Sequence, residues 1–331
     1  MGAEATLLLR RGEIAALLTL SECTAAVEQA LRLHAAGASL PPAVLSVPAA
    51  GGAFHVKAAG LRLGRTYFAA KANGNFPDNP IRRGLPAIQG VIVLCDGDDG
   101  RPLALMDSIE ITVLRTGAVT ALAARHLARP DSKVVTVCGC GLQGRVQLRA
   151  LAGVLNLRQA YVFDRELARA RRLALDLEGE LGFPIEPVAE LETALGRSDI
   201  CVTCTPARRF FLRREAVPRG AFIAAIGADN PDKQELDPTL VASSKLVVDD
   251  LEQCSGLGEL HHALRAGLLD RSRVHAELAA VVSGQRPGRT SADEIIVFDS
   301  TGTALQDAAA AAWVYERALA AGAGIQIELA R

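Results

Sequence analysis

A glycine-rich turn near the middle of the chain has the residue types and spacing that bind a nucleotide pyrophosphate. The apolar run 134–138 leads into Gly139, Cys140, Gly141, Leu142, Gln143 and Gly144. This order predicts a strand, a turn and a helix: Gly139 permits the turn, Gly141 lets a ligand approach the backbone, and Gly144 allows close packing. We expect the pyrophosphate on the free N–H groups at the start of that helix.

An acidic residue follows the next predicted strand at the spacing of a dinucleotide-binding fingerprint. The apolar run 160–163 ends in Asp164, about 20 residues after Gly144. Asp164 can accept hydrogen bonds from ribose hydroxyls and would repel a 2'-phosphate, whereas Arg165 and Arg169 could bind that phosphate or form a solvated helix face. Because the acid occupies the fingerprint position, we predict NAD(H) as the preferred cofactor, with NADP(H) tolerated.

Three further segments follow predicted strands and should meet the cofactor at the same sheet edge. In an open α/β sheet, ligands bind beyond the carboxyl ends of the strands. Asp229 directly follows an apolar strand, so we predict a catalytic acid/base carboxylate near the nicotinamide; an ordinary turn or helix cap is the alternative for an Asp at this place. The residues expected to contact cofactor here are Thr205, Gly227, Ser300 and Gly302.

Two basic residues lie in apolar surroundings in the first third of the chain. Lys71 is flanked by Ala70 and Ala72, and the segment that follows, residues 73–80, is rich in neutral amides. A surface lysine is the usual case, but such a segment is more typical of the rim of a site. Arg115 lies in an apolar helical stretch, so it either pairs with a carboxylate or binds a ligand anion. Period-2 alternation places Lys57 with His55, and Lys71 with Asn73, on single strand faces.

These residues together resemble a known family. The matching segments are Lys71 with 73–80, 84–90, 114–118, 123–130, 139–144 and 227–229. In this order, over about residues 10–320, they are similar to the ornithine cyclodeaminase/mu-crystallin family. The resemblance implies interconversion of α-imino and α-amino acids by hydride transfer, catalysis by Asp229 and Lys71, substrate-carboxylate binding by Lys71 and Arg115, and a cofactor contact around Arg115 and Thr116.

The resemblance also implies a domain arrangement and an assembly. Residues 1–116 and 302–331 would form an N-terminal α/β substrate-binding and dimerisation domain completed by the C-terminal helix. Residues 117–301 would form a doubly wound Rossmann domain. The expected partners are a small amino or imino acid and a second copy of the chain.

Two positions depart from the family pattern and bear on the substrate. An arginine and a threonine found in many members are here Ala43 and Ala87. Lys57 could supply the missing positive charge, though without the bidentate geometry of arginine. We therefore predict a Δ1-pyrroline-2-carboxylate (ketimine) reductase in preference to an ornithine cyclodeaminase. A crystallin-like, NADPH-dependent ligand-binding protein is a third hypothesis.

Composition excludes several other classes. The 331 residues are 50% hydrophobic, with a formal net charge of −1, so two domains are expected and no nucleic-acid partner is implied. The sequence has no uninterrupted apolar run of membrane-spanning length, and we expect a cytoplasmic protein. The seven cysteines lack the pairing of a metal site or disulfide framework, so we expect free thiols and no metal.

The periodicity predicts the elements that hold these residues. Two helices over 12–36, with Ser21 as N-cap, precede an antiparallel-type sheet built from short runs between residues 41 and 105. Asp107 should cap a helix that runs to Leu127 and joins the two domains. Alternating strands and helices follow, with a helix over 275–283, and the alanine-rich final helix 305–321 should be buried.

Overall fold

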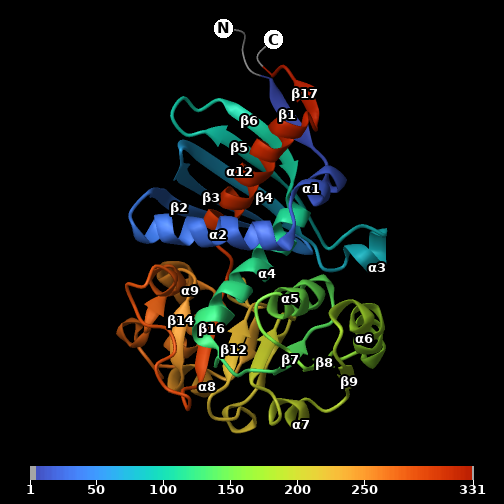
Figure 1. Ribbon diagram of the computed structural model, residues 1–331, viewed down its shortest axis with the longest axis vertical. Helices are drawn as coiled ribbons and strands as arrows, with labels where there is room; N and C mark the ends of the chain where they lie inside the picture. Colours follow the sequence, from blue (N-terminus) through green and yellow to red (C-terminus); the bar gives the residue numbers. More distant parts are fainter. Residues whose placement is uncertain (1–4, 330–331) are drawn as a thin grey trace. The chain divides into compact units, whose positions relative to one another are not determined.

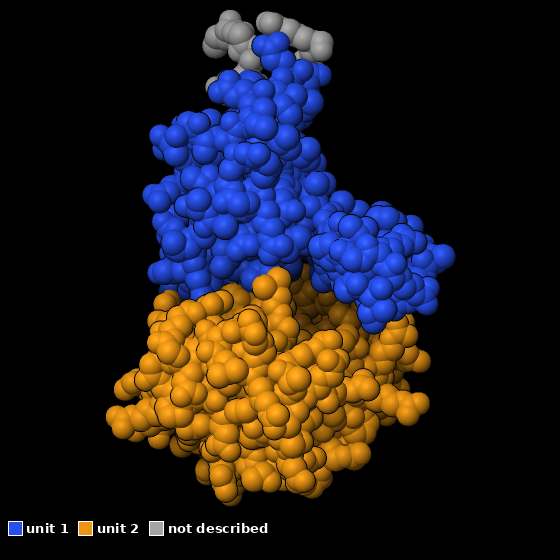
Figure 2. Space-filling model, turned by 90° about the vertical axis from the view of Figure 1, so that its right-hand side faces the viewer, with its two compact units in different colours: residues 1–115, 303–331 blue, residues 116–302 orange. Residues whose placement is uncertain are grey.

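The computed structural model describes residues 5–329 and divides the chain into two compact units, coloured separately in Figure 2. The first unit comprises Met1–Arg115 and Thr303–Arg331, and the second comprises Thr116–Gly302. Helix α4 (Ser108–Leu127) contributes residues to both units. The chain is thus an α/β protein, as predicted.

The first unit contains a seven-stranded mixed sheet in the order β17-β1-β6-β5-β4-β3-β2. Strands β2 to β6 pair antiparallel in sequence order, and β1 adds to β6 in parallel. The elements are β1 (Thr6–Leu9), α1 (Arg11–Leu17), α2 (Leu20–Ala35), β2 (Ser39–Ala49), β3 (Gly52–Leu63), β4 (Arg65–Asn75), α3 (Asn79–Arg83), β5 (Ile88–Asp96), β6 (Pro102–Asp107), α12 (Ala304–Ala321) and β17 (Ile325–Ile327).

Helix α12 lies across one face of this sheet, over β3 and β4 and beside α2 (Figure 1). Its alanines are buried, as predicted, because small side chains let the helix approach the alanines and glycine of these strands closely. Lys57 pairs with Lys71 and His55 with Asn73 in the antiparallel register. The predicted strand faces are therefore correct, and the two lysines lie on the face that α12 covers.

The second unit is built on an eight-stranded parallel sheet in the order β15-β14-β16-β12-β10-β7-β8-β9. This is the doubly wound arrangement that the alternation of strands and helices predicts. Its strands are β7 (Val134–Cys138), β8 (Gln159–Phe163), β9 (Ile185–Val188), β10 (Ile200–Thr203), β12 (Phe222–Ala225), β14 (Lys245–Val248), β15 (Ala276–Glu277) and β16 (Ile296–Asp299), with β11 (Arg208–Leu212) and β13 (Gln234–Leu236) forming a separate pair. Its helices are α5 (Leu142–Ala152), α6 (Leu167–Leu181), α7 (Leu191–Leu195), α8 (Pro238–Ser243), α9 (Leu251–Gly256), α10 (Gly258–Arg265) and α11 (Leu278–Val282), with short turns at Arg214–Ala216 and Arg271–Arg273.

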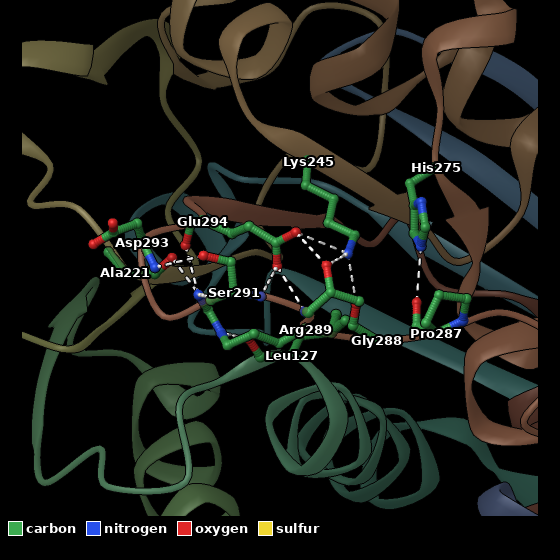
Figure 3. A network of polar contacts seen from close by, with 11 residues as sticks. Leu127, Ala221, Lys245, His275, Pro287, Gly288, Arg289, Ser291, Asp293 and Glu294 are labelled. Atoms are coloured by element: carbon green, nitrogen blue, oxygen red, sulfur yellow. Dashed lines mark hydrogen bonds and ion pairs between the residues drawn. The ribbon is translucent and has the colours of Figure 1, made fainter.

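A polar network closes the amino-terminal edge of this sheet (Figure 3). Arg289 donates to the backbone carbonyl of Leu127 at 2.8 Å and to that of Glu294 at 2.6 Å. Lys245 donates to the carbonyl of Gly288 at 2.6 Å and lies 3.2 Å from the Glu294 carboxylate. The glycine turn lies at the opposite, carboxyl-terminal edge of the sheet, where ligands bind in this kind of fold. We therefore assign the network a role in stabilising the fold and none in ligand binding.

Two predictions differ from the structure, and some strands were not predicted. The N-cap of α2 is Thr19, not Ser21, because Thr19 and Glu22 form a complete capping box. Residues 276 and 277 form strand β15, so the helix predicted over 275–283 is shortened to α11. Strands β1 and β17 were not predicted, since three or four residues pairing across most of the chain length leave no local pattern.

Among the described residues, no single helix is long and apolar enough to cross a membrane. The bent pair Arg11–Leu17 and Leu20–Ala35 passes by length and composition alone, with an 81° bend. All seven cysteines are free, as predicted.

Candidate functional site

The first unit contains a buried cluster of charged side chains that includes Lys71 and Arg115. Lys71 lies on β4 and Arg115 on α4, and both contact Asp307 in the first turn of α12. Lys71 Nζ lies 2.6 Å from Asp307 Oδ2, and Arg115 Nε donates to Asp307 Oδ1 at 3.1 Å. The three side chains are 5%, 8% and 1% exposed. The structure therefore brings both predicted cations to one carboxylate.

Further polar groups complete this cluster. Arg115 Nη1 donates to Gln306 Oε1 at 3.1 Å, and Lys71 Nζ donates to Thr112 Oγ1 at 3.4 Å. Lys57 is also buried, on the strand position opposite Lys71. Three buried cations thus surround one buried anion, an arrangement that favours binding of a further anion.

Burial changes the proton affinity of this cluster. Burial, together with the neighbouring Arg115 and Lys57, lowers the pKa of the Lys71 ammonium to about 7, although Asp307 opposes this shift. Burial raises the pKa of the Asp307 carboxyl, but Lys71 and Arg115 outweigh it, so that the pKa lies below its usual value. Asp307 is therefore ionised at neutral pH, whereas the Lys71 ammonium titrates near neutral pH.

Asp307 was not identified from the sequence. The alanine-rich pattern around it predicts a buried helix and hides the carboxylate. The available signal is that Asp307 is the only charged residue between Ala304 and Tyr315. A single charge in a helix buried on all sides must have a partner.

The predicted glycine turn joins β7 to α5 in the second unit. Gly139 has a φ of +103°, and a Cβ on Gly144 would collide with the carbonyl oxygen of Gly139, so both positions require glycine. By contrast, a Cβ on Gly141 would meet nothing within 4 Å. No side chain caps the start of α5, where Leu142 and Gln143 lie. The turn thus offers free N–H groups and open space, which fits a pyrophosphate.

Asp164 follows β8, as predicted, and also holds this turn. Its Oδ2 accepts the backbone N–H of Cys140 at 2.9 Å, and its Oδ1 accepts that of Glu166 at 3.0 Å. Arg165 is exposed, and Arg169 pairs with Glu166 at 2.9 Å. The fingerprint acid is therefore fixed in position, while one of the two arginines is already engaged.

A buried glutamate that sequence analysis did not identify connects two of the predicted cofactor loops. Glu235 Oε1 accepts the backbone N–H and the hydroxyl of Thr205 at 2.6 and 2.7 Å, and Oε2 accepts the N–H of Gly227 at 2.9 Å. A Cβ on Gly227 would lie 2.5 Å from Glu235 Oε2, so glycine is needed at that position. Burial raises the pKa of Glu235, although these hydrogen bonds oppose it.

Asp229 lies in the loop after β12, near the edge where the carboxyl ends of the strands meet. It is 44% exposed and forms an ion pair with Lys233 at 2.7 Å. The side chain is thus not buried. Its carboxylate remains accessible to a bound ligand.

The loop after β16 is held by another buried acid. Asp249 Oδ2 accepts the Ser300 hydroxyl at 3.0 Å and the Gly302 backbone N–H at 2.6 Å. The structure places Thr205, Gly227, Asp229, Ser300 and Gly302 in loops that follow neighbouring parallel strands.

The other residue predicted to contact the cofactor, Thr116, lies on α4 and is buried.

The two positions that depart from the family pattern lie in the first unit. Ala43 is exposed on β2 and pairs with Ala58, whereas Lys57 pairs with Val44 and with Lys71. Ala87 is half-buried, and its carbonyl accepts the N–H of Phe76 at 2.7 Å. Lys57, not position 43, is therefore the residue in register with Lys71.

A doubly wound parallel sheet with an open glycine turn and a buried cluster of cations are features that an NAD-dependent oxidoreductase of amino and imino acids requires. The chain belongs to the ornithine cyclodeaminase/mu-crystallin family, whose sequence profile matches residues 4–322.

Solved structures support this assignment. An archaeal alanine dehydrogenase dimer with bound NAD is 37% identical, covers 98% of this chain and 99% of its own, and superposes with a TM-score of 0.93. The Thermococcus litoralis Δ1-pyrroline-2-carboxylate reductase in complex with NADH and L-proline is 33% identical, with coverages of 97% and 100% and a TM-score of 0.92. The Paracoccus denitrificans iminosuccinate reductase in complex with NAD⁺ is 33% identical, with coverages of 98% and 100% and a TM-score of 0.90.

Proposed function

We propose that this protein is an NAD(H)-dependent reductase of small α-imino acids, most like a Δ1-pyrroline-2-carboxylate reductase. The observation that carries the proposal is the buried cluster of Lys71, Arg115 and Asp307. A carboxylate is common to all α-imino acids, and buried cations recognise it strongly. The similarity to reductases of cyclic and linear imines supports the same class.

The residues would divide the chemistry as follows. Lys71 and Arg115, with Lys57, hold the substrate carboxylate, and Asp229 exchanges the proton on the substrate nitrogen. NADH, when bound, would supply the hydride for the carbon of the C=N bond and would be converted to NAD⁺. A protonated imine and this hydride together would give the neutral amine.

For the cofactor we propose a preference for NAD(H) with NADP(H) tolerated. Gly139, Gly141 and Gly144 would receive the pyrophosphate together with the N–H groups of Leu142 and Gln143. Asp164 would accept the ribose hydroxyls, and Arg165 would offset part of its repulsion of a 2'-phosphate. The relatives with bound NAD, NADH and NAD⁺ support this preference.

The direct test is a panel of imines. Purified protein is mixed with NADH or NADPH and either Δ1-pyrroline-2-carboxylate, the six-membered ring analogue, iminosuccinate, or pyruvate with ammonia, and cofactor oxidation is followed at 340 nm. We expect the cyclic imines to give the highest kcat/KM. Turnover of the linear imines alone would instead indicate an alanine dehydrogenase or an iminosuccinate reductase. No turnover, with cofactor-dependent binding of an apolar ligand, would favour the binding-protein hypothesis.

Ornithine cyclodeamination is the second candidate, because the family to which the chain belongs includes ornithine cyclodeaminases. It oxidises ornithine, releases ammonia on ring closure and reduces the ring imine with the same bound cofactor. Incubation with ornithine and catalytic NAD⁺ distinguishes the two. Proline and ammonia without net NADH would replace the reductase proposal.

We also propose a homodimer formed through the open face of the first unit's sheet. On the face opposite Lys71, an apolar surface includes Leu45, Val47, Phe54 and Val91, which are 58%, 45%, 49% and 41% exposed. An apolar sheet face of this kind is stabilised by packing against another sheet. A second copy provides one, and the archaeal relative is a dimer.

A further inference from the structure

Asp307 is the one residue in the charged cluster that has no assigned role, although it contacts both proposed carboxylate-binding side chains. Each of its oxygens has a different partner: Oδ2 lies 2.6 Å from Lys71 Nζ, and Oδ1 accepts Arg115 Nε at 3.1 Å. Lys71 is on β4, Arg115 on α4 and Asp307 on α12. One carboxylate thus fixes two cations that come from different parts of the sequence.

The groups around Lys71 in this unit leave Asp307 as its counter-charge. Lys57 faces it from β3, Arg115 from α4 and the Thr112 hydroxyl also from α4. The β5 neighbour in register is Ile92, which is buried and apolar. From α2, the buried Cys23 thiol lies close to Arg115 and Asp307, and burial raises its pKa to about 12, so it stays neutral.

We propose that Asp307 is a positioning residue, which keeps Lys71 protonated and aimed, together with Arg115, at the substrate carboxylate. This inference rests on the proposed function for the statement that a substrate carboxylate binds at this site. The effect of Asp307 on the protonation of Lys71 does not depend on any substrate. Without the Asp307 charge, burial and two neighbouring cations all favour the neutral amine. A neutral Lys71 would lose most of its attraction for a carboxylate.

The charges around Lys71 decide whether this side chain keeps its proton. Burial, Arg115 and Lys57 together lower the pKa of Lys71 to about 7, and the ion pair with Asp307 at 2.6 Å opposes this shift. A purely structural ion pair would leave catalysis indifferent to the charge at position 307. A positioning role requires that Lys71 titrates at lower pH when this charge is removed.

The experiment measures the titration of Lys71 directly. The chain has five lysines, at positions 57, 71, 133, 233 and 245. Competitive labelling with acetic anhydride between pH 5 and 11, followed by peptide mass spectrometry, gives the pKa of each amine without any substrate. We expect that Asp307→Asn moves the Lys71 midpoint down by about one pH unit or more. The exposed Lys133 is an internal reference that should not move.

Gln306→Leu is the matched control. It changes the adjacent residue on α12 and removes a contact with Arg115, but leaves the charge facing Lys71. We expect its Lys71 midpoint to stay at the wild-type value. Asp307→Glu keeps the charge and should do the same. Should Asp307→Asn not fold, the comparison is repeated in a Lys57→Met background, which removes one buried cation.

The second readout is the pH profile of imine reduction. In the wild type, kcat/KM should fall as the pH rises through the Lys71 midpoint, and in Asp307→Asn this limb should move to lower pH by the same amount. An unchanged Lys71 midpoint in a folded Asp307→Asn variant overturns the inference. A shifted midpoint in a protein that reduces no imine would support Asp307 and reject the proposed function instead.

Discussion

The Glu235 carboxylate accepts both the backbone N–H and the hydroxyl of Thr205, at 2.6 and 2.7 Å. Its other oxygen accepts the N–H of Gly227 at 2.9 Å. The loops after β10 and β12 are thereby tied to one buried acid. Glu235 in turn receives support from Glu259, which accepts the Glu235 backbone N–H at 2.8 Å.

Glu235→Gln should weaken cofactor binding. An amide has one acceptor oxygen, so its NH₂ group would face the N–H of either Thr205 or Gly227 and one hydrogen bond would be lost. We expect the Kd for NADH, measured by fluorescence titration, to rise about tenfold, which corresponds to roughly 1.4 kcal/mol. Asp232→Asn changes an exposed residue in the loop that joins β12 to β13, and it should leave the Kd for NADH unaltered. An equal Kd in Glu235→Gln would show that the loops do not depend on this acid.

Asp299 should make stability depend on pH in a defined direction. Burial raises its pKa to about 7, with Asp249 and Glu235 adding to the shift, whereas the unfolded carboxyl titrates near 3.8. Because the folded-state pKa is raised, the protonated group contributes fully below about pH 4, and this contribution is lost as the pH rises through 7.

Asp299→Asn removes that titration. The wild type should lose stability between pH 5 and pH 8, as Asp299 ionises in its buried site, whereas the variant has no group at this position to ionise. Any stability deficit of the variant at pH 5 should therefore shrink or reverse at pH 8. Urea unfolding at both pH values measures it, with the exposed Glu192→Gln as control. A deficit that stays constant between pH 5 and 8 would contradict the raised pKa.

Sequence patterns predicted most of the fold because apolar and polar residues repeat every two residues in a half-buried strand and about every three to four in a half-buried helix. The period-2 pattern placed Lys57 and Lys71 on one strand face, and the register of β3 and β4 confirms it. The glycine turn was predictable because Gly139 and Gly144 each answer a local steric demand. The burial of the alanine-rich helix α12 followed from its composition.

The residues that were missed act over long sequence distances. Asp307 is separated from Lys71 by most of the chain, and only the fold brings them together. Glu235 follows an ordinary loop, and nothing in its neighbours marks it as the acceptor for Thr205 and Gly227. The partners of a buried charge are a tertiary property, so a sequence can reveal the need for a partner without naming it.

Asp229→Asn should lower kcat for imine reduction by about 10²-fold or more, if Asp229 exchanges the proton on the substrate nitrogen. The amide keeps the size of the side chain but cannot exchange a proton. The measurement is steady-state turnover together with the solvent deuterium isotope effect. Unchanged turnover, with an isotope effect showing that proton transfer limits the rate, would remove Asp229 from this role.

Leu45→Glu should disrupt the proposed dimer. A carboxylate on the apolar face would be buried against the second copy without a partner, which is strongly unfavourable. Sedimentation velocity should show a dimer for the wild type and a monomer for the variant at micromolar concentration. Leu175→Glu is the control, because Leu175 is 79% exposed on α6 in the second unit. A Leu45→Glu variant that still sediments as a dimer would place the interface elsewhere.

Asp164→Asn should shift cofactor preference toward NADPH. The asparagine oxygen can still accept the N–H of Cys140, although the hydrogen bond from the Glu166 N–H is lost. The charge that repels a 2'-phosphate is gone, and Arg165 remains. We expect the ratio of kcat/KM for NADPH to that for NADH to rise about tenfold, worth roughly 1.4 kcal/mol. Adding Arg165→Gln should reverse the gain, since the remaining Arg169 is paired with Glu166. A wild-type preference of tenfold or more for NADPH would show instead that the arginines already outweigh Asp164.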